Sequence, residues 1–511
     1  MNIIIGHNES GKSTLLQAID IALNQRGNGD RRNSNEYGTL LNIEATQNFL
    51  SGIKKGQTDS SYLPKIEVEL FFSEDSSPNI HDNIFNGPNN STGKIANGLT
   101  FTYSFDDRFI TEYNYLVKHT TLDFIPFEFY SPHWDLFNGT SYNFRKNPFK
   151  SILIDNDKVK GDSYRAFTRQ FLSTLDSSQQ HTLSLKLKTH INQFNSEISQ
   201  LNLGTDQLGV DPTRLIIQDS LDVFASRDRN LLLRDMGNGT ENIIKTELAL
   251  SSKNSRLILL EEPENHLSFD LAREQIRKIQ GAKQEERQVI VSTHSPLLAS
   301  KLSIDNLKWL NQDDKLVSFK SISKDTTDFF LKADNIDILQ VILAEKVILV
   351  EGATEYIIMQ DIIKNHFGKS ADQLKIHIVS MGGNYYKRFR EIVNITKNKV
   401  LAITDNDGNE NRIKEAAQKT NEYFYIAMPN DIKHFTFEAS LYYANKSFFT
   451  SALWNHKSTI ASWKEHFKLD KELVWLLNHK TDAAFEYSEY LKDKKLSIPQ
   501  YITGGLEWLL K

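Results

Sequence analysis

Residues 2–14, NIIIGHNESGKST, carry the strongest structural signal in the chain. The three isoleucines form a short apolar run typical of a buried strand. A G-x-x-x-x-G-K-S pattern follows, and residues 14–23 then show helical periodicity. Gly6 and Gly11 allow backbone N–H groups to surround phosphates, and the N-terminus of the next helix adds positive potential. The stretch therefore predicts the strand, phosphate loop and helix of a nucleotide-binding α/β sheet.

This loop assigns the first candidate binding residues. Lys12 is expected to reach the β- and γ-phosphates of ATP, and the Ser13 hydroxyl is expected to ligate Mg²⁺. The remaining residues expected to bind the cofactor lie in the loop and at the helix start: Gly6, Asn8, Gly11 and Thr14. A glycine-containing turn without a ligand is the alternative, and the match at every fixed position of the pattern disfavours it.

Two apolar runs farther along the chain also end in polar residues. The first ends in Glu261 and Glu262, where one carboxylate can hold the metal and the other can polarise the attacking water. We assign Glu261 to the metal and Glu262 to the general base. The second run leads to His294, which is expected to sense the γ-phosphate. A solvated acidic turn and a structural histidine are the alternatives, and the phosphate loop favours the functional interpretation.

A second group of acidic residues follows two more apolar runs. The first run ends in Glu351, with Glu355 one helical turn later, and the second ends in Asp405 and Asp407. Because the carboxyl ends of parallel strands share one edge of a sheet, we expect these four side chains to emerge together. Like-charge repulsion makes such packing costly unless cations neutralise it. Two Mg²⁺ or Mn²⁺ ions about 4 Å apart would clamp a phosphodiester there.

Composition limits the possible classes of protein. The chain has 511 residues, 39% hydrophobic and 24% charged, which suits several globular domains and excludes collagen-like, mucin-like and wholly disordered chains. It has no cysteine, which excludes disulfide scaffolds, thiolate zinc sites and cysteine nucleophiles. Its net charge of −5 means that a nucleic-acid partner must meet local basic surface or bound metal. Without a long apolar run or a signal peptide, a cytoplasmic protein with no membrane partner is expected.

The order of apolar runs predicts two α/β units with parallel sheets. The β-type runs are 2–5, 257–260, 289–292, 347–350, 376–379, 400–404 and 423–428. We expect an ATPase unit at 1–325, a connection at 326–340 and a second α/β domain at 341–511. Helical spacing without proline or glycine before Gly204 predicts a helical insertion at about 160–205.

The phosphate loop, LILLEEPENHL at 257–267 and VIVSTHSP at 289–296 together resemble an ABC-type ATPase head. They are most similar to the RecF/SMC-like branch and to the OLD (overcoming lysogenization defect) ATPases. The resemblance implies a homo-oligomer of at least two heads, each closing a signature loop over its partner's nucleotide. Gly237, Asn238 and Gly239 fit the place of that signature, although they depart from its LSGGQ pattern. Such heads usually have a short β segment before the first strand, so we expect this edge to be missing or covered by another chain.

The Glu351-Gly352 and Asp405-x-Asp407 pair resembles the Toprim domain, and an ABC head followed by Toprim is the arrangement of the OLD family. The resemblance implies a Rossmann-like parallel α/β domain with a metal-dependent nuclease site. It adds Glu438, in the segment FTFE at 435–438, to the expected metal ligands. It also implies a late catalytic lysine, Lys495 or alternatively Lys494; a solvated lysine pair is the other interpretation.

The function implied is an ATP-hydrolysing, divalent-metal-dependent DNA endonuclease. Similar proteins often serve bacterial defence against phage, alone or with a helicase or a retron reverse transcriptase and its DNA. The alternative is a non-cutting, ATP-dependent DNA clamp of repair type, but a docking domain has little need of four grouped carboxylates. A topoisomerase would require a catalytic tyrosine in a separate DNA-gate domain. The basic and aromatic stretch at 385–390 is either a DNA-backbone contact or an ordinary amphipathic helix.

Overall fold

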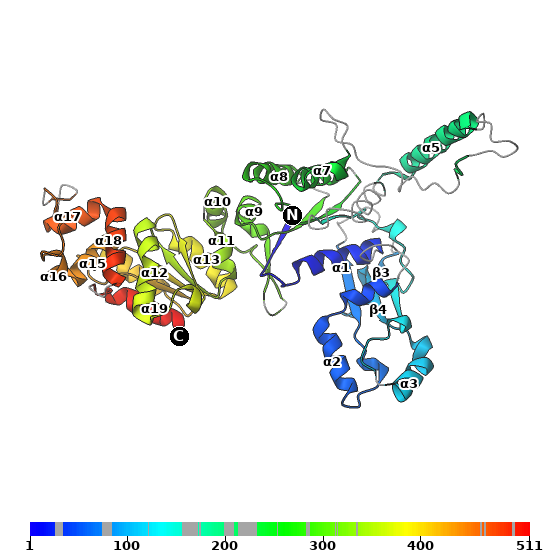
Figure 1. The fold of residues 1–511 in the computed structure, drawn as a ribbon, viewed down its shortest axis with the longest axis horizontal. Helices are drawn as coiled ribbons and strands as arrows, with labels where there is room; N and C mark the ends of the chain where they lie inside the picture. The colour runs from blue at the N-terminus through cyan, green and yellow to red at the C-terminus, as the bar shows by residue number, and fades with distance from the viewer. Residues whose placement is uncertain are drawn as a thin grey trace. The chain divides into compact units, whose positions relative to one another are not determined.

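The fold is described by a computed structural model (Figure 1). It describes residues 1–25, 34–73, 84–120, 122–155, 172, 175–198, 209–212, 232–252, 254–282, 287–311, 313, 315–333, 336–459, 462–463, 467–492 and 496–511. The chain divides into two compact units. The N-terminal unit comprises Met1–Ile4 with Gly11–Thr293, and the C-terminal unit comprises Ile5–Ser10 with His294–Lys511.

A parallel sheet lies at the centre of the N-terminal unit. Four of its strands, all parallel, stand in the order β1 (Asn2–Ile5), β8 (Gln288–Ser292), β7 (Leu257–Glu261) and β6 (Ile152–Asp155). Helix α1 (Lys12–Asn24) follows the phosphate loop, and Leu16 of α1 packs in one core with Leu259. Most residues of these strands are buried, which explains why the sequence shows continuous apolar runs here. The predicted parallel α/β architecture is confirmed.

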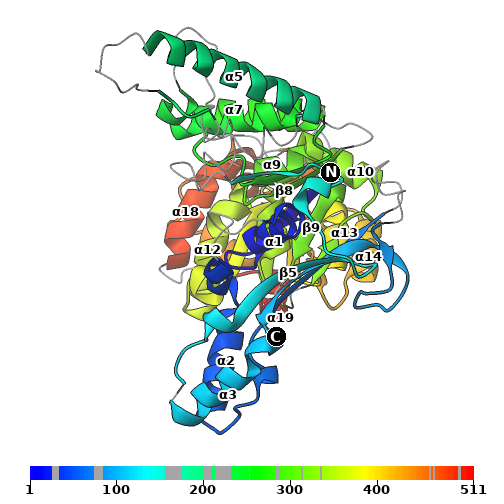
Figure 2. The same cartoon turned by 90° about the vertical axis from the view of Figure 1, so that its right-hand side faces the viewer.

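An antiparallel sheet is inserted between α1 and β6. It consists of β2 (Ile66–Phe72), β3 (Asn86–Gly87), β4 (Ala96–Phe105) and β5 (Tyr130–Leu136), with β4 paired to all three others. Helices α2 (Ile43–Ile53) and α3 (Ile110–His119) lie at one end of it (Figure 2). The β-type runs predicted from the sequence do not include the strands of this sheet.

The helices of this unit include one that is largely exposed. Helix α5 (Ser177–Ile198) lies within the predicted helical insertion, and none of its residues is buried. Much of the rest of that predicted segment is outside the described residues. Helices α7 (Asn238–Ser251) and α8 (Phe269–Gly281) also belong to this unit. No helix in the described part of the chain is long and apolar enough to cross a membrane.

The C-terminal unit is built on a second parallel sheet, in the order β12 (Ile376–Ser380), β11 (Lys346–Val350), β13 (Lys399–Ile403) and β14 (Phe424–Ala427). Residues of α12 (Ala353–Phe367) and α19 (Gln500–Leu510) share a core with alternate residues of β11 and β13, such as Ile348 and Leu401. Helix α13 (Tyr386–Thr396) connects β12 to β13, and helix α14 (Glu410–Lys419) connects β13 to β14. This strand–helix alternation matches the expected Rossmann-like domain.

Smaller elements precede and follow that sheet. Before it come α9 (Pro296–Lys301), the antiparallel pair β9 (Leu307–Leu310) and β10 (Leu316–Ser318), α10 (Lys324–Lys332) and α11 (Ile338–Leu343). After β14 come α15 (Phe437–Ala444), α16 (Lys446–Phe449), the pair β15 (Ser462–Trp463) and β16 (Phe467–Lys468), α17 (Lys471–Asn478) and α18 (Lys480–Lys492).

The start of helix α10 is tied to helix α13 through Glu391. Its carboxylate accepts hydrogen bonds from the Ser323 backbone N–H (3.0 Å), the Ser323 hydroxyl (3.0 Å) and the Thr326 hydroxyl (2.8 Å). Arg388 adds a 3.8 Å ion pair with Asp325. Negative charge at a helix N-terminus is favourable, so this contact both caps α10 and holds it to the second sheet.

The basic and aromatic stretch at 385–390 is therefore engaged within the chain. Tyr385 packs on Phe329 of α10, and Lys387 pairs with Glu415 at 2.7 Å. Phe389 is fully buried. These contacts agree with the interpretation of residues 385–390 as an amphipathic helix.

We predict that Glu391→Ala lowers the stability of the C-terminal unit by about 1–3 kcal/mol, the worth of hydrogen bonds to a charged acceptor. Burial alone would raise the pKa of Glu391, but the bonds from Ser323 and Thr326 outweigh it and the pKa is lowered. A lowered folded-state pKa gives stability that is present above the unfolded pKa and is lost as pH falls through the folded pKa. Calorimetric melting should therefore separate the variant from wild type at pH 7 and much less at pH 3. Glu422→Ala, at an exposed position, is the control.

Candidate functional sites

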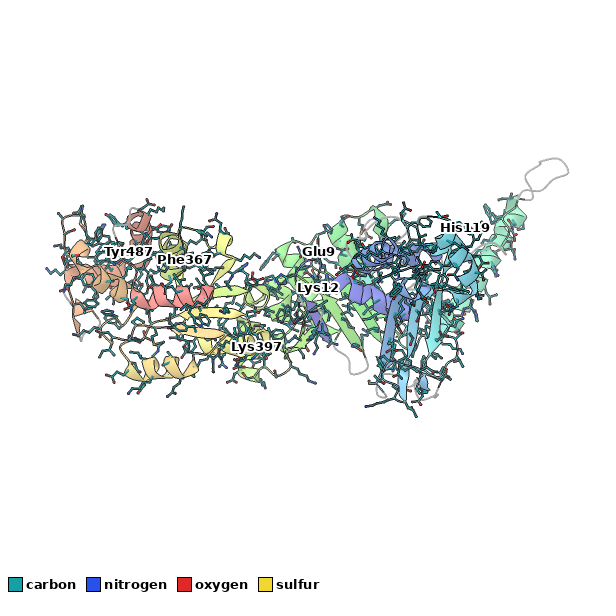
Figure 3. The ribbon with its side chains drawn as sticks, turned by 90° about the horizontal axis from the view of Figure 1, so that it is seen from below. Glu9, Lys12, His119, Phe367, Lys397 and Tyr487 are labelled. Atoms are coloured by element: carbon teal, nitrogen blue, oxygen red, sulfur yellow. The ribbon has the colours of Figure 1, made fainter. Side chains whose placement is uncertain are left out.

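The phosphate loop has the backbone conformation that its sequence requires. Gly11 precedes α1 with φ 90°, and Glu9 has φ 65°, both in the left-handed region. A side chain at Gly6 would collide with Ser10 and would lie 2.9 Å from the carbonyl oxygen of Leu310. Figure 3 labels Glu9 in the loop and Lys12 at the start of α1. The predicted loop thus leads directly into a helix N-terminus.

The side chains at this helix start differ in exposure. Lys12 is only 5% exposed, whereas Ser13 and Thr14 are exposed, as is Asn8 in the loop. Exposed hydroxyl groups at a helix N-terminus can reach a phosphate or its metal ion. The expected binding residues of the loop are therefore placed where a nucleotide could meet them.

Glu261 and Glu262 lie near Lys12. Burial lowers the pKa of Lys12, and the charges of Glu262 and Glu261 act in the opposite direction. Glu261 is the buried last residue of β7, and Glu262 follows with φ 41°, an uncommon conformation for a residue with a side chain. The backbone N–H of Glu262 donates to Ser292 (3.0 Å), and Asn265 donates to the Glu262 carboxylate (2.7 Å). Both predicted carboxylates are thus fixed beside the phosphate-loop lysine.

His294 follows the strand that neighbours the phosphate-loop strand. Ile4 of β1 pairs with Ser292 of β8, and Thr293 donates to the Ile4 carbonyl at 3.1 Å. The loops after β1 and β8 therefore leave the sheet at one edge. His294 is half-buried, and Ser295 next to it caps α9. Its role as a γ-phosphate sensor stays a prediction.

The candidate signature residues lie at the start of α7. Gly237 precedes the helix and Asn238 is its first residue. A side chain at Gly239 would meet the carbonyl oxygen of His266 at 2.5 Å, so only glycine permits this close approach. The predicted glycine-rich turn before a helix is present, and its action across a dimer stays a prediction.

The second group of carboxylates gathers at the carboxyl edge of the β11–β13 pair. Glu351 follows β11, and its carboxylate accepts hydrogen bonds from the Thr404 hydroxyl (3.0 Å) and the Asp405 backbone N–H (2.9 Å). Glu355, in the first turn of α12, accepts from the Gly352 N–H at 3.1 Å. Glu438, in the first turn of α15, is 1% exposed. The polypeptide thus brings together Glu351, Glu355, Asp405 and Glu438.

Electrostatics shows that these carboxylates share one environment. Burial raises the pKa of Asp405 well above its usual value, and Glu355, Glu351 and Glu438 raise it further. The pKa of Glu355 is raised to about 7, first by burial and then by Glu438 and Glu351. Such mutual repulsion is what a bound divalent cation would relieve.

Asp407 is not part of this group. It is 59% exposed and forms an ion pair with Arg412. In an extended strand, residues two positions apart point to the same side, which would have placed Asp407 beside Asp405. The φ of 51° at Asp407 is not an extended conformation, so its side chain points elsewhere. Asn406 between them is fully buried and donates to the carbonyls of Pro429 (2.9 Å) and Asp431 (3.0 Å), which anchors the turn. The expectation that Asp405 and Asp407 emerge together does not match the structure. Lys494 and Lys495 lie outside the described residues.

Lys480 is a residue of this site that the sequence reasoning missed. Its Nζ lies 2.9 Å from the Glu438 carboxylate. Burial acts to lower the pKa of Lys480, but Glu438, followed by Asp405 and Glu355, raises it overall. Lys480 is the first residue of α18, where the helix dipole disfavours a cation. A lysine at a helix start is the sequence signal that could have suggested an acidic partner.

The donor set suits a magnesium or manganese ion. Among the described residues, no group of three or more histidine or acidic side chains lies where it could hold a metal ion. Mg²⁺ is usually held by only one or two carboxylates and completes its shell with water and substrate phosphate. Such an ion would therefore be held here by one or two of these carboxylates, with other oxygen ligands completing its shell.

Two family models match the chain. One, described as "AAA ATPase domain", matches residues 1–299. The other, described as "Overcoming lysogenization defect protein-like, TOPRIM domain", matches residues 342–407. The resemblance inferred from the motifs is thereby confirmed, and the two domains stand in the order that the motifs predicted.

Two curated relatives are similar to the chain. The "Old nuclease" of Escherichia phage P2 is 25% identical over 244 residues, which cover 42% of this chain and 41% of that protein. The "ATP/GTP phosphatase" of Helicobacter pylori (strain ATCC 700392 / 26695) is 24% identical over 359 residues, covering 66% of this chain and 87% of that protein. The match thus spans about two fifths of the phage relative's length.

Solved structures with some likeness include two SMC heads. A SmcHead bound to the C-winged helix domain of ScpA is 16% identical, with a TM-score of 0.32, over 62% of this chain and 89% of that chain. The SMC head domain from Thermotoga maritima is 13% identical, with a TM-score of 0.23, over 60% of this chain and 84% of that one.

Proposed function

Because the chain belongs to the AAA ATPase domain family and carries a Toprim domain of the OLD type behind it, we propose that it is an ATP-hydrolysing, metal-dependent endonuclease that cleaves DNA. The observation that supports this most directly is the buried carboxylate group around Asp405. Four grouped acids cost free energy in any folded protein. A protein that hydrolyses phosphodiesters with a metal ion needs such acids as ligands for the ion.

At the Toprim site, water would attack the phosphorus and one ester P–O bond would break. A bound Mg²⁺ or Mn²⁺ would supply the positive charge that this reaction needs. One or two of the carboxylates of Asp405, Glu351 and Glu355 would hold the ion. The bonds from Thr404 and the Asp405 N–H fix Glu351 so that little reorganisation is needed.

At the ATPase site, Lys12 would neutralise the β- and γ-phosphates and Ser13 would ligate Mg²⁺ with Glu261. Glu262 would orient the attacking water, and His294 would sense the γ-phosphate. Two copies of the chain would complete each site if Gly237–Gly239 of one copy closed over the nucleotide of the other. A role in bacterial defence against phage, alone or with a helicase or a retron reverse transcriptase, rests on the family resemblance.

A plasmid-nicking assay tests the proposal. Supercoiled DNA is incubated with the full chain and Mg²⁺ or Mn²⁺, with and without ATP, and nicked and linear products are separated on a gel. Metal-dependent nicking that EDTA stops is the expected result. If the purified chain binds ATP and DNA but leaves both strands intact with either metal, the proposal fails and the DNA-clamp alternative gains support.

We predict that Thr404→Val reduces nicking about 10- to 100-fold, the usual effect of removing a group that orients a metal ligand. Thr404 is buried, accepts a hydrogen bond from Asn384 (3.0 Å) and donates one to Glu351 (3.0 Å). Valine keeps the shape but lacks the hydroxyl, so Glu351 loses its orientation. Thr404→Ser restores the donor and should recover most of the rate. Equal rates for the valine and serine variants would show that the hydroxyl has no such role.

A further inference from the structure

The start of helix α7 lies against the turn that holds Glu262. Asn242 is fully buried, and its side-chain amide donates to the backbone carbonyl of Asn265 at 3.0 Å. Gly239, earlier on the same helix, comes so near the next carbonyl that an added Cβ would stand 2.5 Å from the oxygen of His266. Two consecutive carbonyl groups of the turn after β7 are therefore approached by one helix start.

The same turn directs an amide at the Glu262 carboxylate. The Asn265 side-chain nitrogen donates to Glu262 Oε2 at 2.7 Å, and the Asn265 backbone N–H donates to the Glu262 carbonyl at 3.0 Å. The Glu262 N–H donates to the carbonyl of Ser292 in β8 at 3.0 Å. These bonds hold Glu262 at φ 41°, a conformation that persists only where the surrounding structure enforces it. A continuous path of hydrogen bonds thus runs from Asn242 through Asn265 to the Glu262 carboxylate.

Helix α7 buries mostly polar side chains, which are usually exposed. Its buried residues are Glu241, Asn242, Lys245, Thr246 and Ala249. An apolar side chain of the same size would often be at least as stable as a buried polar one. Stability alone therefore does not account for an asparagine at 242, whereas the bond to the Asn265 carbonyl does.

From these contacts we propose that Asn265, held in place by Asn242, is a positioning residue for ATP hydrolysis. Its amide bonds to Oε2 of Glu262 and fixes the plane of the carboxylate, so that Oε1 is the oxygen that takes the proton of the attacking water. A base that is oriented in advance needs little reorganisation during the reaction. The inference rests on the proposed role of Glu262 as the general base. Asn265 acts through that base, and Asn242 acts one hydrogen bond farther away.

Phosphate release and titration calorimetry with ATP, both on the full chain with Mg²⁺, test the proposal. Asn265→Ala should lower kcat about 10- to 100-fold, the usual effect of losing a group that orients a functional residue, and should leave the affinity for ATP unchanged. Asn242→Leu removes the donor to the Asn265 carbonyl at similar volume and should lower kcat about fivefold. Asn254→Ala is the matched control, because Asn254 donates to the Asp176 carboxylate at 3.2 Å at an exposed position of the same unit.

A double-mutant cycle separates positioning from a general structural role. If Asn265 acts through Glu262, Asn265→Ala causes no further loss of kcat in the Glu262→Gln background. An equal fold-loss in both backgrounds, or a wild-type kcat in Asn265→Ala with a normal melting curve, would overturn the inference. Wild-type hydrolysis by Glu262→Gln alone would instead contradict the general-base role, and the positioning role with it.

Nuclear magnetic resonance of side-chain amides tests the contact without any turnover. The full chain is labelled with ¹⁵N at asparagine and observed without nucleotide. Glu262→Gln should shift the amide signals of one asparagine, because a hydrogen bond to a charged acceptor is shorter and stronger than one to a neutral acceptor. The same signals should be missing from Asn265→Ala. Spectra in which no asparagine side-chain amide shifts would overturn the inference even if Asn265→Ala fails to fold.

Discussion

Asp405→Asn is expected to reduce DNA nicking about a thousandfold, which corresponds to roughly 4 kcal/mol of lost transition-state stabilisation. The negative charges of the other carboxylates in the group all raise the pKa of Asp405. Asparagine has nearly the same shape but carries no charge, so the site keeps its form and loses its attraction for the cation. Nicking measured at saturating Mn²⁺, with ATP binding as an independent check, gives the result.

The same variant should be at least as stable as wild type in metal-free buffer. The pKa of Asp405 is raised in the folded state, so the folded protein loses stability as pH rises from the unfolded-state pKa of this acid towards its folded-state pKa. Asparagine removes this loss, so the melting-temperature difference in favour of the variant should grow as pH rises above the ordinary pKa of an aspartate. Asp372→Asn, at an exposed position in the same unit, should change neither nicking nor melting. A variant that nicks at the wild-type rate would remove Asp405 from the site.

Lys12→Ala should weaken ATP binding about 10- to 100-fold, the equivalent of roughly 1.5–3 kcal/mol for a charge-assisted hydrogen bond. Lys12 is nearly buried beside Glu261 and Glu262, so its loss also leaves two carboxylates facing the phosphates. The loss of the positive charge and the two uncompensated carboxylates both lower the affinity for an anionic ligand. Titration calorimetry with ATP and Mg²⁺ measures the affinity, and phosphate release measures turnover.

Lys65→Ala is the control for Lys12, because Lys65 is an exposed lysine of the same unit that pairs with Glu67. Wild-type affinity in Lys12→Ala would contradict the assignment of the phosphate loop. Nicking by this variant then reveals whether nucleotide restrains or promotes cleavage.

The sequence by itself determined most strands of the two parallel sheets and the residues at their carboxyl edges, but it did not indicate β6. Strands buried on both faces need continuous apolar runs, so they can be located without knowledge of their neighbours. The phosphate loop is equally local, since glycine at 6 and 11 is required by the backbone. Glu261, Glu351 and Asp405 then follow from the rule that side chains after parallel strands meet at one edge.

Only the tertiary structure decided how the charges pair. Glu438 and Lys480 lie 42 positions apart and on different helices, and no periodic pattern connects them. The direction of the Asp407 side chain depends on the φ of 51° at that residue and on the burial of Asn406. An Asp-x-Asp motif predicts neither of these two features. A motif specifies which acids leave a strand. The turn and the neighbouring helices determine which of those acids remain for a metal ion, because charges pair through space and not along the chain.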